Sequence, residues 1–455
     1  MPMPPAAATT TKTERGVLTY GAVNRDILRP LFKPTPLYLM ALGAALTAMA
    51  IGGTCWAIQL DQGLGVAGYN PPVMWGVYIT TFVFWVGIGH AGTLISAILF
   101  LFRSRWRTGI YRASEAMTIF AVMTAGLFPI LHAGRCWLVF WLFPYPNQRE
   151  LWPNFKSPLV WDVFAISTYF TISAVFFFIG LIPDVAAIRD ASKGTMRKIY
   201  AALSLGWHGT NNQWHHYMAA YGFFAALCTP LVLSVHSVVS WDFAMAQTAG
   251  WHSTIFPPYF VAGAIFSGCA MVLTLLIPMR TLFHFEEYLT MWHFEHLAKL
   301  CLLTGGILTY AYSIEHFIGW YSDNPYEWGI FVFRATGEYA WVFWIMVFCN
   351  CVAPLPWWFK KIRTNITWLF VISIFINIGM WFERFNIIAS SLAHMNDPGS
   401  WTYYTPGYIE MGIFLGSFGW FSFWFLLFAK VMPSVAIAEV KEGLRPPLKS
   451  DEEAA

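Results

Sequence analysis

Long apolar runs separated by short polar segments dominate the chain from about residue 37 to residue 430. A helix that crosses a membrane needs about 20 mainly apolar residues in succession. Ten such runs are present, near residues 37–59, 73–102, 113–142, 158–188, 214–243, 256–279, 294–320, 337–357, 366–390 and 406–430. The pattern therefore predicts an all-α integral membrane protein with about ten transmembrane helices.

The composition agrees with a chain that faces lipid. Hydrophobic residues make up 57% of the 455 residues and charged residues only 11%, whereas soluble domains usually carry about 25% charged residues. A net charge of +3 is too small to indicate a nucleic-acid partner. The seven cysteines are scattered, without a CxxC motif or a clustered run. We therefore expect no metal site and no iron–sulfur cluster in this chain.

Positive charge is unevenly divided between the two sides of the membrane. Ten spans place both chain ends on one side, and that side carries 22 of the 27 Lys and Arg residues. The remaining five are Arg135, Arg149, Lys156, Arg334 and Arg384. Because cytoplasmic flanks are enriched in Lys and Arg, we predict that both termini are cytoplasmic.

A weak internal repeat indicates a duplicated fold. Segment 90–99, a basic loop and Glu115 have a counterpart in segment 267–274, the 280–293 loop and Glu295. The repeat predicts two four-helix bundles, formed by helices 2–5 and 6–9, with one flanking helix at each end; chance similarity between apolar segments is the alternative. The expected parts are a cytoplasmic N-terminal tail (1–36), a first transmembrane helix with an outer loop (37–72), a first bundle that contains the candidate site (73–243), a second bundle (244–390), and a last helix with a cytoplasmic C-terminal tail (391–455).

Ionisable side chains within the spans gather near one depth of the first bundle. Such residues cost several kcal/mol in lipid unless they face protein or water, so they mark candidate sites. On the expected helix 113–142, His132 and Arg135 lie about ten residues before the outer end. The next helix begins with Asp162, and the fifth helix ends on the same side with His236 and Asp242. We expect these residues to form one cluster near the outer face.

The chemistry of this cluster suits a quinol. Oxidation of a quinol removes two electrons and two protons, so the site needs bases and a cation that stabilises developing negative charge. His132 and Asp162 are the candidate catalytic bases, and Arg135 is the candidate cation. His236 and Asp242 are candidate binding residues. The alternative is a salt bridge between Arg135 and Asp162, with His132 as a packing hydrogen bond.

Further ionisable residues suggest a route for protons. In the second half of the chain they are Glu315, His316, Arg334, Glu338, Glu383 and Arg384. Acids and bases nearly balance there, which favours paired charges that hold the second bundle together; a proton route or a wall of the quinol pocket is the alternative. In the first bundle, His90 and Glu115 are candidates for a polar thread that carries protons, although polar residues that merely pack helices give the same pattern.

Haem b held between two histidines is an alternative cofactor. His90 with His132, or His132 with His236, would supply the ligands. These histidines are few and lie beside Asp and Arg rather than among apolar residues, which favours proton handling. We therefore expect neither haem nor an iron–sulfur cluster in this chain, so that electrons from quinol must pass to a partner subunit.

Three segments resemble the NrfD/polysulfide-reductase family of membrane subunits and, within it, the ActC-type subunits of bacterial alternative complex III. They are 89–99 (GHAGTLISAIL), 128–135 (FPILHAGR) and 157–162 (SPLVWD). The resemblance covers nearly the whole chain. It implies a subunit of the bacterial inner membrane that oxidises menaquinol or a similar quinol near the periplasmic face. It places quinol binding on His132 and Asp162, with Arg384 as a further binding residue.

The resemblance also implies partners. These are a periplasmic iron–sulfur subunit that accepts the electrons, c-type haem subunits, a paralogous membrane subunit and, as an optional member, a terminal oxidase. Proton translocation and simple proton release outside both stay open. One alternative function is a paralogous, non-catalytic subunit that conducts protons or anchors extrinsic subunits. The other is a secondary transporter, which would place its polar site at the bilayer centre rather than near one face.

Overall fold

The structure is a computed structural model that describes residues 18–32, 34–143 and 155–444. Its described residues include ten helices long and apolar enough to cross a membrane, so the prediction of an all-α, multi-pass membrane protein is confirmed. The spans are α2 (Pro36–Gln62), α3 with its continuation through α4 (Val77–Leu101), α5 (Tyr111–His132), α6 (Pro158–Ala191), α8 (Asn211–Ala244), α9 (Phe256–Leu282), α10 (Met291–Tyr321), α12 with its continuation (Ala340–Trp358), α14 (Ile366–Ala393) and α15 (Tyr408–Val431).

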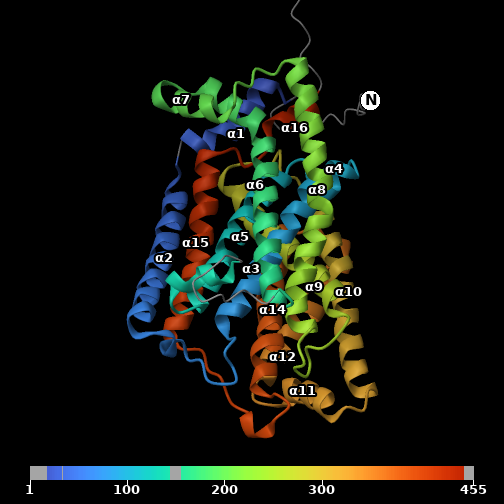
Figure 1. Cartoon of the computed structure of the whole chain (residues 1–455). Helices are drawn as coiled ribbons and strands as arrows, with labels where there is room; N and C mark the ends of the chain where they lie inside the picture. The colour runs from blue at the N-terminus through green and yellow to red at the C-terminus, as the bar shows by residue number, and fades with distance from the viewer. Residues whose placement is uncertain (1–17, 33, 144–154, 445–455) are drawn as a thin grey trace, which may run out of the picture.

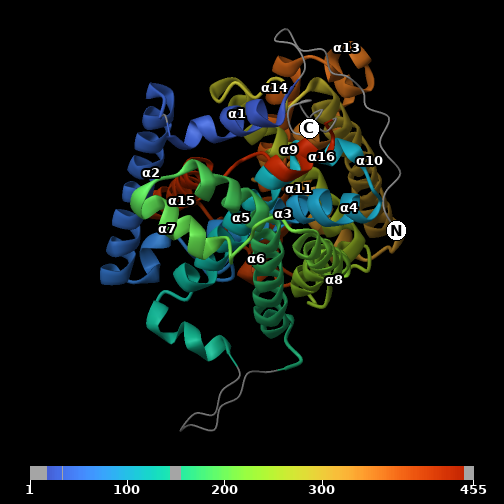
Figure 2. The ribbon, with the colours of Figure 1, turned by 90° about the horizontal axis from the view of Figure 1, so that it is seen from above.

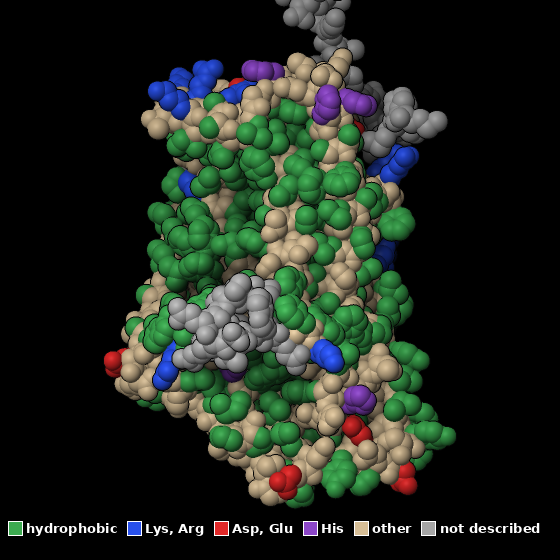
Figure 3. Space-filling view, in the orientation of Figure 1, with side chains coloured by type: hydrophobic (Ala, Val, Ile, Leu, Met, Phe, Trp, Pro, Cys, Tyr) green, Lys and Arg blue, Asp and Glu red, His purple; other side chains and the backbone are tan. Residues whose placement is uncertain are grey.

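Short helices cover the two ends of the bundle. At one end lie α1 (Tyr20–Phe32), α7 (Gly194–Leu203) and α16 (Ile437–Glu442), and at the opposite end lies α11 (Pro325–Thr336) (Figure 1). Lys and Arg side chains gather at the first of these ends (Figure 3), which we call the basic end; the opposite end is the outer end. Both ends of the described chain lie at the basic end, and its assignment to the cytoplasm stays a prediction. The predicted tails at 1–17 and 445–455, and Arg149, lie outside the described residues.

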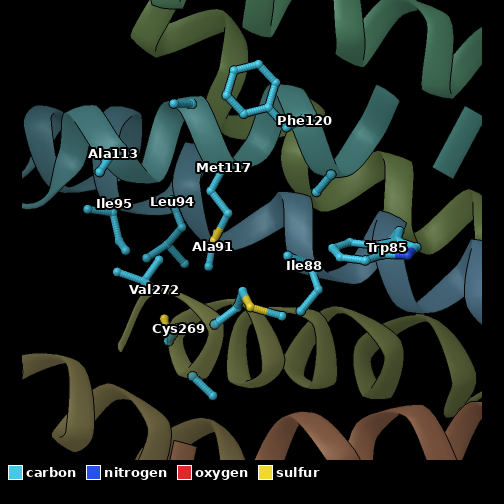
Figure 4. Close-up of a cluster of buried hydrophobic side chains, with 14 of the residues drawn as sticks. Trp85, Ile88, Ala91, Leu94, Ile95, Ala113, Met117, Phe120, Cys269 and Val272 are labelled. Carbon is cyan, nitrogen blue, oxygen red and sulfur yellow. The ribbon is translucent and has the colours of Figure 1, made fainter. Parts of the chain in front are cut away.

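The central helix of the molecule is α3. Almost every residue of α3 is buried, and it packs between α5 and α9. Figure 4 shows Ala91 of α3 between Met117 of α5 and Cys269 of α9. Small residues bring the backbones together: a Cβ added at Gly268 would lie 2.5 Å from the Ala91 Cβ. Close van der Waals packing of this kind holds membrane helices together, because lipid is as apolar as the side chains themselves.

The remaining spans surround α3 and α9. α5 packs on α3, and α6 packs on α5 and α8, while α10 packs on α9 and α12 packs on α14. α8 and α14 each contact both α3 and α9. This packing is compatible with two bundles, and the exact bundle limits drawn from the repeat stay a prediction. α2 and α15 pack together outside both groups, where a Cβ added at Gly52 would lie 2.6 Å from the Gly416 Cα.

Two predicted spans need correction. The helix predicted for 113–142 ends at His132, because Gly134 has a left-handed backbone (φ +68°) that an α-helix cannot accommodate. The chain continues as a 3₁₀ segment, Cys136–Leu142. His132 therefore closes its helix instead of lying ten residues before the end. The span predicted for 337–357 begins at Ala340, after the separate helix α11, and contains a π-helical turn at Phe348–Val352.

Candidate functional site

Asp162 and Asp242, predicted for the outer end, meet there. Asp162 is the fifth residue of α6, just after its first turn, Asp242 lies in the last turn of α8, and the two helices pack together. Their carboxyl groups are within hydrogen-bonding reach of each other. In the described part of the chain, one oxygen of each carboxyl is buried without a hydrogen-bond partner. Because like charges this close in a dry site cannot both ionise, the pair is suited to take up and release one proton.

A second contact joins the same two helices at the outer end. The indoles of Trp161 and Trp241, the residues that precede the two aspartates, pack edge to face with ring centroids 5.8 Å apart. Aromatic pairs of this geometry are favourable, so this contact helps to hold α6 against α8.

His132 and Arg135 have different surroundings. The His132 ring meets the Tyr69 ring edge to face at 5.7 Å, and its Nδ1 atom is buried without a partner among the described residues. Beside it, Gln59 of α2 donates a hydrogen bond of 2.9 Å to the Leu131 carbonyl. Arg135 is exposed. The described residues contain no ion pair between Arg135 and Asp162, so the salt bridge considered from the sequence does not form.

His236 lies deeper in the first bundle than the aspartates. It is fully buried, and its ring centroid is 4.6 Å from that of His90 on α3. His90 Nδ1 lies 2.7 Å from the Val86 carbonyl, whereas His90 Nε2 and both His236 nitrogens have no partner in the described chain. The structure thus places His90 next to His236. The two histidine pairs considered as haem ligands both included His132, so neither is this pair. Among the described residues, no group of three or more His, Cys, Asp or Glu side chains is arranged to hold a metal ion.

A line of polar groups runs from His90 towards the basic end. The Tyr169 ring stacks on His90 at 5.3 Å. The Tyr169 hydroxyl donates to the Gly89 carbonyl at 2.9 Å and lies 2.7 Å from the Thr93 hydroxyl. Thr118 of α5 donates to the same Gly89 carbonyl at 2.6 Å. The Tyr169 and Thr93 hydroxyls can exchange a proton with each other, since each both donates and accepts. The Gly89 carbonyl only accepts, and it therefore separates Thr118 from Tyr169.

Glu115 lies one helical turn from Thr118, in a buried ion-pair network. Arg112 bonds to Glu115 at 3.0 Å and to Asp184 of α6 at 3.1 Å. Tyr221 of α8 donates to Glu115 at 3.2 Å. The backbone N–H of Ala438 donates to Asp184 at 3.1 Å, so α16 covers this network at the basic end.

Glu383 and Arg384 form the centre of the second polar group. Arg384 donates to Glu383 at 2.8 Å, and the Tyr259 hydroxyl donates to the same oxygen at 2.5 Å. The Arg384 guanidinium lies over the Phe260 ring at 4.2 Å, and that ring also meets His236 at 5.7 Å. Glu383 and Arg384 therefore form an ion pair, as the interpretation of balanced charges in the second half of the chain proposes. Phe260 contacts both Arg384 and His236, so its ring lies between this ion pair and the first bundle.

Arg334 of α11 joins three helices at the outer end. Its guanidinium lies 3.9 Å from Glu315 of α10 and donates to Ser391 of α14 at 2.6 Å. Burial lowers the pKa of Arg334, and the negative charge of Glu315 opposes this effect. His316 packs against aromatic rings, including that of Phe331 at 4.8 Å. Glu338 is exposed between α11 and α12 and does not join the buried group.

Several buried polar residues were not selected from the sequence. They are Gln59, Arg112, Asp184, Tyr169, Tyr259 and Glu410. Glu410 of α15 accepts hydrogen bonds from the Val77 backbone N–H at 3.0 Å and from the Tyr404 hydroxyl at 2.5 Å. It thereby caps the first residue of α3 from another helix. Glu410 lies near the end of an apolar run, where an acid has the sequence pattern of an interfacial residue. Asp184, by contrast, lies inside its apolar run, and an ionisable residue in that position could have been selected from the sequence.

Comparison with known proteins places the chain in a family. The family model described as "Polysulphide reductase, NrfD" matches residues 65–396. The chain belongs to the NrfD family. The NrfD match begins before α3 and ends after α14, so it includes both polar groups described above. α2 and α15 lie outside it.

Three curated relatives are similar to this NrfD chain. A putative dimethyl sulfoxide reductase membrane subunit of Halobacterium salinarum is 27% identical over 52% of this chain and 50% of that protein. The "Hdr-like menaquinol oxidoreductase integral membrane subunit" of Archaeoglobus fulgidus is 22% identical over 81% of each. A selenate reductase subunit of Mesobacillus selenatarsenatis is 22% identical over 63% of this chain and 67% of that protein. The chain thus spans about half the length of the first relative.

Proposed function

We propose that this protein is the membrane subunit that binds and oxidises quinol in an electron-transfer complex of the alternative complex III type. The observation that carries the proposal is the carboxyl pair of Asp162 and Asp242 at the outer end of α6 and α8, buried and short of hydrogen-bond partners among the described residues. The name of one family relative, a menaquinol oxidoreductase subunit, supports quinol as the substrate. Menaquinol is therefore the quinol that we propose first.

The proposed reaction assigns a role to each group at the outer end. A quinol loses two electrons and two protons to become a quinone. His132 Nδ1 accepts one proton and the aspartate pair accepts the other, after which both are released on the outer side. Arg135 attracts the negative charge that develops on the quinol oxygen. The electrons pass to an iron–sulfur subunit on the same side.

The remaining features of the proposal concern the assembly. The excess of Lys and Arg at the basic end supports cytoplasmic termini, and hence a periplasmic outer end in a bacterial inner membrane. The electron acceptor would be a periplasmic iron–sulfur subunit, followed by c-type haem subunits. A paralogous membrane subunit and a terminal oxidase complete the proposed partners.

A second candidate role, proton conduction through the first bundle, is favoured by the polar line between Glu115 and His236. The Tyr169 and Thr93 hydroxyls lie 2.7 Å apart and can exchange a proton, and Tyr169 stacks on His90. In this role the chain carries protons between the ion-pair network and the histidine pair. It is compatible with quinol oxidation in the same subunit and equally with a non-catalytic, proton-conducting paralogue.

The test is quinol-dependent reduction of the redox centres in the purified complex. Asp162→Asn and His132→Ala should abolish most of the reduction without changing which proteins the complex contains. Asp61→Asn and His252→Ala are matched controls, because both residues are exposed and lie outside the proposed site. Normal rates in both site variants would refute the assignment, and equal losses in the controls would show a nonspecific effect.

A separate measurement tests proton conduction. Glu115→Gln should leave quinol-dependent reduction unchanged and remove proton uptake from the basic end in proteoliposomes. Tyr169→Phe, which keeps the ring but removes the hydroxyl that links Gly89 and Thr93, should have the same effect. Undiminished proton uptake in both variants would contradict this role.

A further inference from the structure

A cavity of about 710 Å³ lies at the basic end, away from the carboxyl pair of Asp162 and Asp242 and next to the end of α6 that carries Asp184. It is formed by α1, the end of α6, the segment between α7 and α8, and α16. Apolar groups make up part of its wall, among them Leu28, Phe32 and Trp207. The cavity therefore offers contacts to a molecule that has an apolar portion.

Positive charge makes up the other part of the wall. Among the described residues, the wall includes Arg25 and Arg29 of α1, Arg189 of α6 and Lys441 of α16, and one carboxylate, that of Asp190. Arg189 already bonds to Asp190 at 2.8 Å, which neutralises both charges. The other three cations leave the cavity positive.

Two of these cations are well placed to bind an anion. Arg29 donates to the Phe283 carbonyl at 2.6 Å, so its guanidinium is held in place by a neutral group that leaves its positive charge available. Burial lowers the pKa of Lys441 and the negative charge of Asp184 opposes this effect. The Lys441 ammonium also lies 5.8 Å from the Tyr20 ring centroid, and an anion in the cavity would add to the stabilisation of its charge.

Asn24 adds a polar group to the same wall. Its Oδ1 atom is buried without a hydrogen-bond partner in the described chain. An amide oxygen is an acceptor, so Asn24 can accept a hydrogen bond from a hydroxyl group on the bound molecule. The glycerol headgroup of phosphatidylglycerol carries such hydroxyls next to its phosphate.

The position of the cavity along the bundle matches the headgroup layer of a membrane. α6 has 34 residues, which is about 51 Å at 1.5 Å per residue, whereas the hydrocarbon core is about 30 Å thick. The cavity involves only the last part of α6, from Pro183 to Ala191. α1 lies across the basic end rather than along the bundle (Figures 1 and 2). The cavity therefore lies where lipid headgroups meet the protein.

We propose that this cavity binds the phosphate group of an anionic phospholipid. Arg25, Arg29 and Lys441 pair with the phosphate, and Leu28 and Phe32 contact the lipid chains. Basic pockets beside membrane helices bind anionic headgroups, and the forked guanidinium of Arg fits phosphate oxygens. A zwitterionic headgroup brings its own cation into a positive cavity, so the site selects anionic lipid.

Lipid binding at this site also affects α16, the short helix that lies over the buried ion-pair network of the first bundle. α16 supplies Lys441 to the cavity, while its Glu439 bonds to Arg107 at 2.8 Å and its Ala438 N–H bonds to Asp184. A phosphate that holds Lys441 therefore helps to hold α16 over the buried ion-pair network.

The test compares lipid binding by matched variants of the purified protein in detergent. Arg25→Gln/Lys441→Gln removes two cations of the cavity, and Arg197→Gln/Lys198→Gln removes two exposed cations of α7 outside it. Native mass spectrometry follows the binding of dioleoyl-phosphatidylglycerol and dioleoyl-phosphatidylcholine. We expect wild type to prefer phosphatidylglycerol, the cavity variant to bind it about 30-fold more weakly, and the α7 variant to match wild type. Equal binding of both lipids by wild type, or equal losses in both variants, would overturn the proposal.

A single variant and a competition experiment complete the test of lipid binding. Arg25→Gln alone changes an exposed position of α1 and should weaken binding about fivefold, so the test holds even if the double variant does not fold. Inorganic phosphate is the second probe. Displacement of phosphatidylglycerol by millimolar phosphate would identify the free anion as the ligand and overturn the assignment to lipid, whereas resistance to displacement supports the lipid headgroup.

Discussion

Removal of the Arg112 charge tests how strongly the buried ion-pair network stabilises the first bundle. The Arg112 side chain is 1% exposed, and those of its partners Glu115 and Asp184 are 3% and 1% exposed. Arg112→Met keeps much of the apolar volume but leaves two carboxylates without a counter-charge. Removing one partner of a buried ion pair costs about 3–5 kcal/mol, because the remaining charge stays out of water. We expect the free energy of unfolding to fall by about this amount.

The assay is unfolding by sodium dodecyl sulfate titration in mixed micelles. Adding Glu115→Gln and Asp184→Asn to Arg112→Met should recover at least half of the lost free energy, because the uncompensated charges are then absent. Arg105→Met is the control, since Arg105 is exposed, and should change stability by less than about 0.5 kcal/mol. A loss below about 1 kcal/mol in Arg112→Met would refute the reasoning, as would a triple variant as unstable as the single one.

Three further predictions concern other contacts. Glu410→Ala removes one of the two acceptors of the Val77 N–H, the other being the Tyr404 hydroxyl, and also the acceptor for that hydroxyl. It should cost about 1–3 kcal/mol of unfolding free energy; the same titration measures it, and an unchanged value would contradict the cap. Gly416→Leu should weaken the packing of α2 on α15 by about 1–3 kcal/mol, because a Cβ there already lies 2.6 Å from the Gly52 Cα; unchanged stability would exclude this close approach. Burial lowers the pKa of His394, so its contribution to stability is complete above the ordinary value of about 6.5 and is lost as the pH falls. His394→Phe should flatten thermal stability between about pH 7 and 5, and a wild-type pH dependence in that variant would contradict the role of His394.

Apolar length alone determined most of the fold. A segment that crosses lipid must satisfy its backbone hydrogen bonds internally, so each sufficiently long apolar run becomes a helix. α6, for example, covers Pro158–Ala191 where the sequence predicts 158–188. The correction at His132 arose because a left-handed Gly134 ends α5 although the apolar residues continue. Apolar composition shows where the chain can remain in lipid, and backbone conformation decides where the helix stops.

The sequence also identified individual polar residues, but the tertiary structure decided which of them meet. The sequence predicts one cluster, but in the structure Asp162 lies beside Asp242, His236 pairs with His90, and Arg135 is exposed. The physical reason is that lipid and the protein interior are equally apolar, so the pattern along a membrane helix does not show which face is buried. Contacts between small residues on neighbouring helices set the rotation of each helix about its axis. That rotation, and not the spacing of residues in the chain, decides which buried polar groups lie close enough to exchange protons.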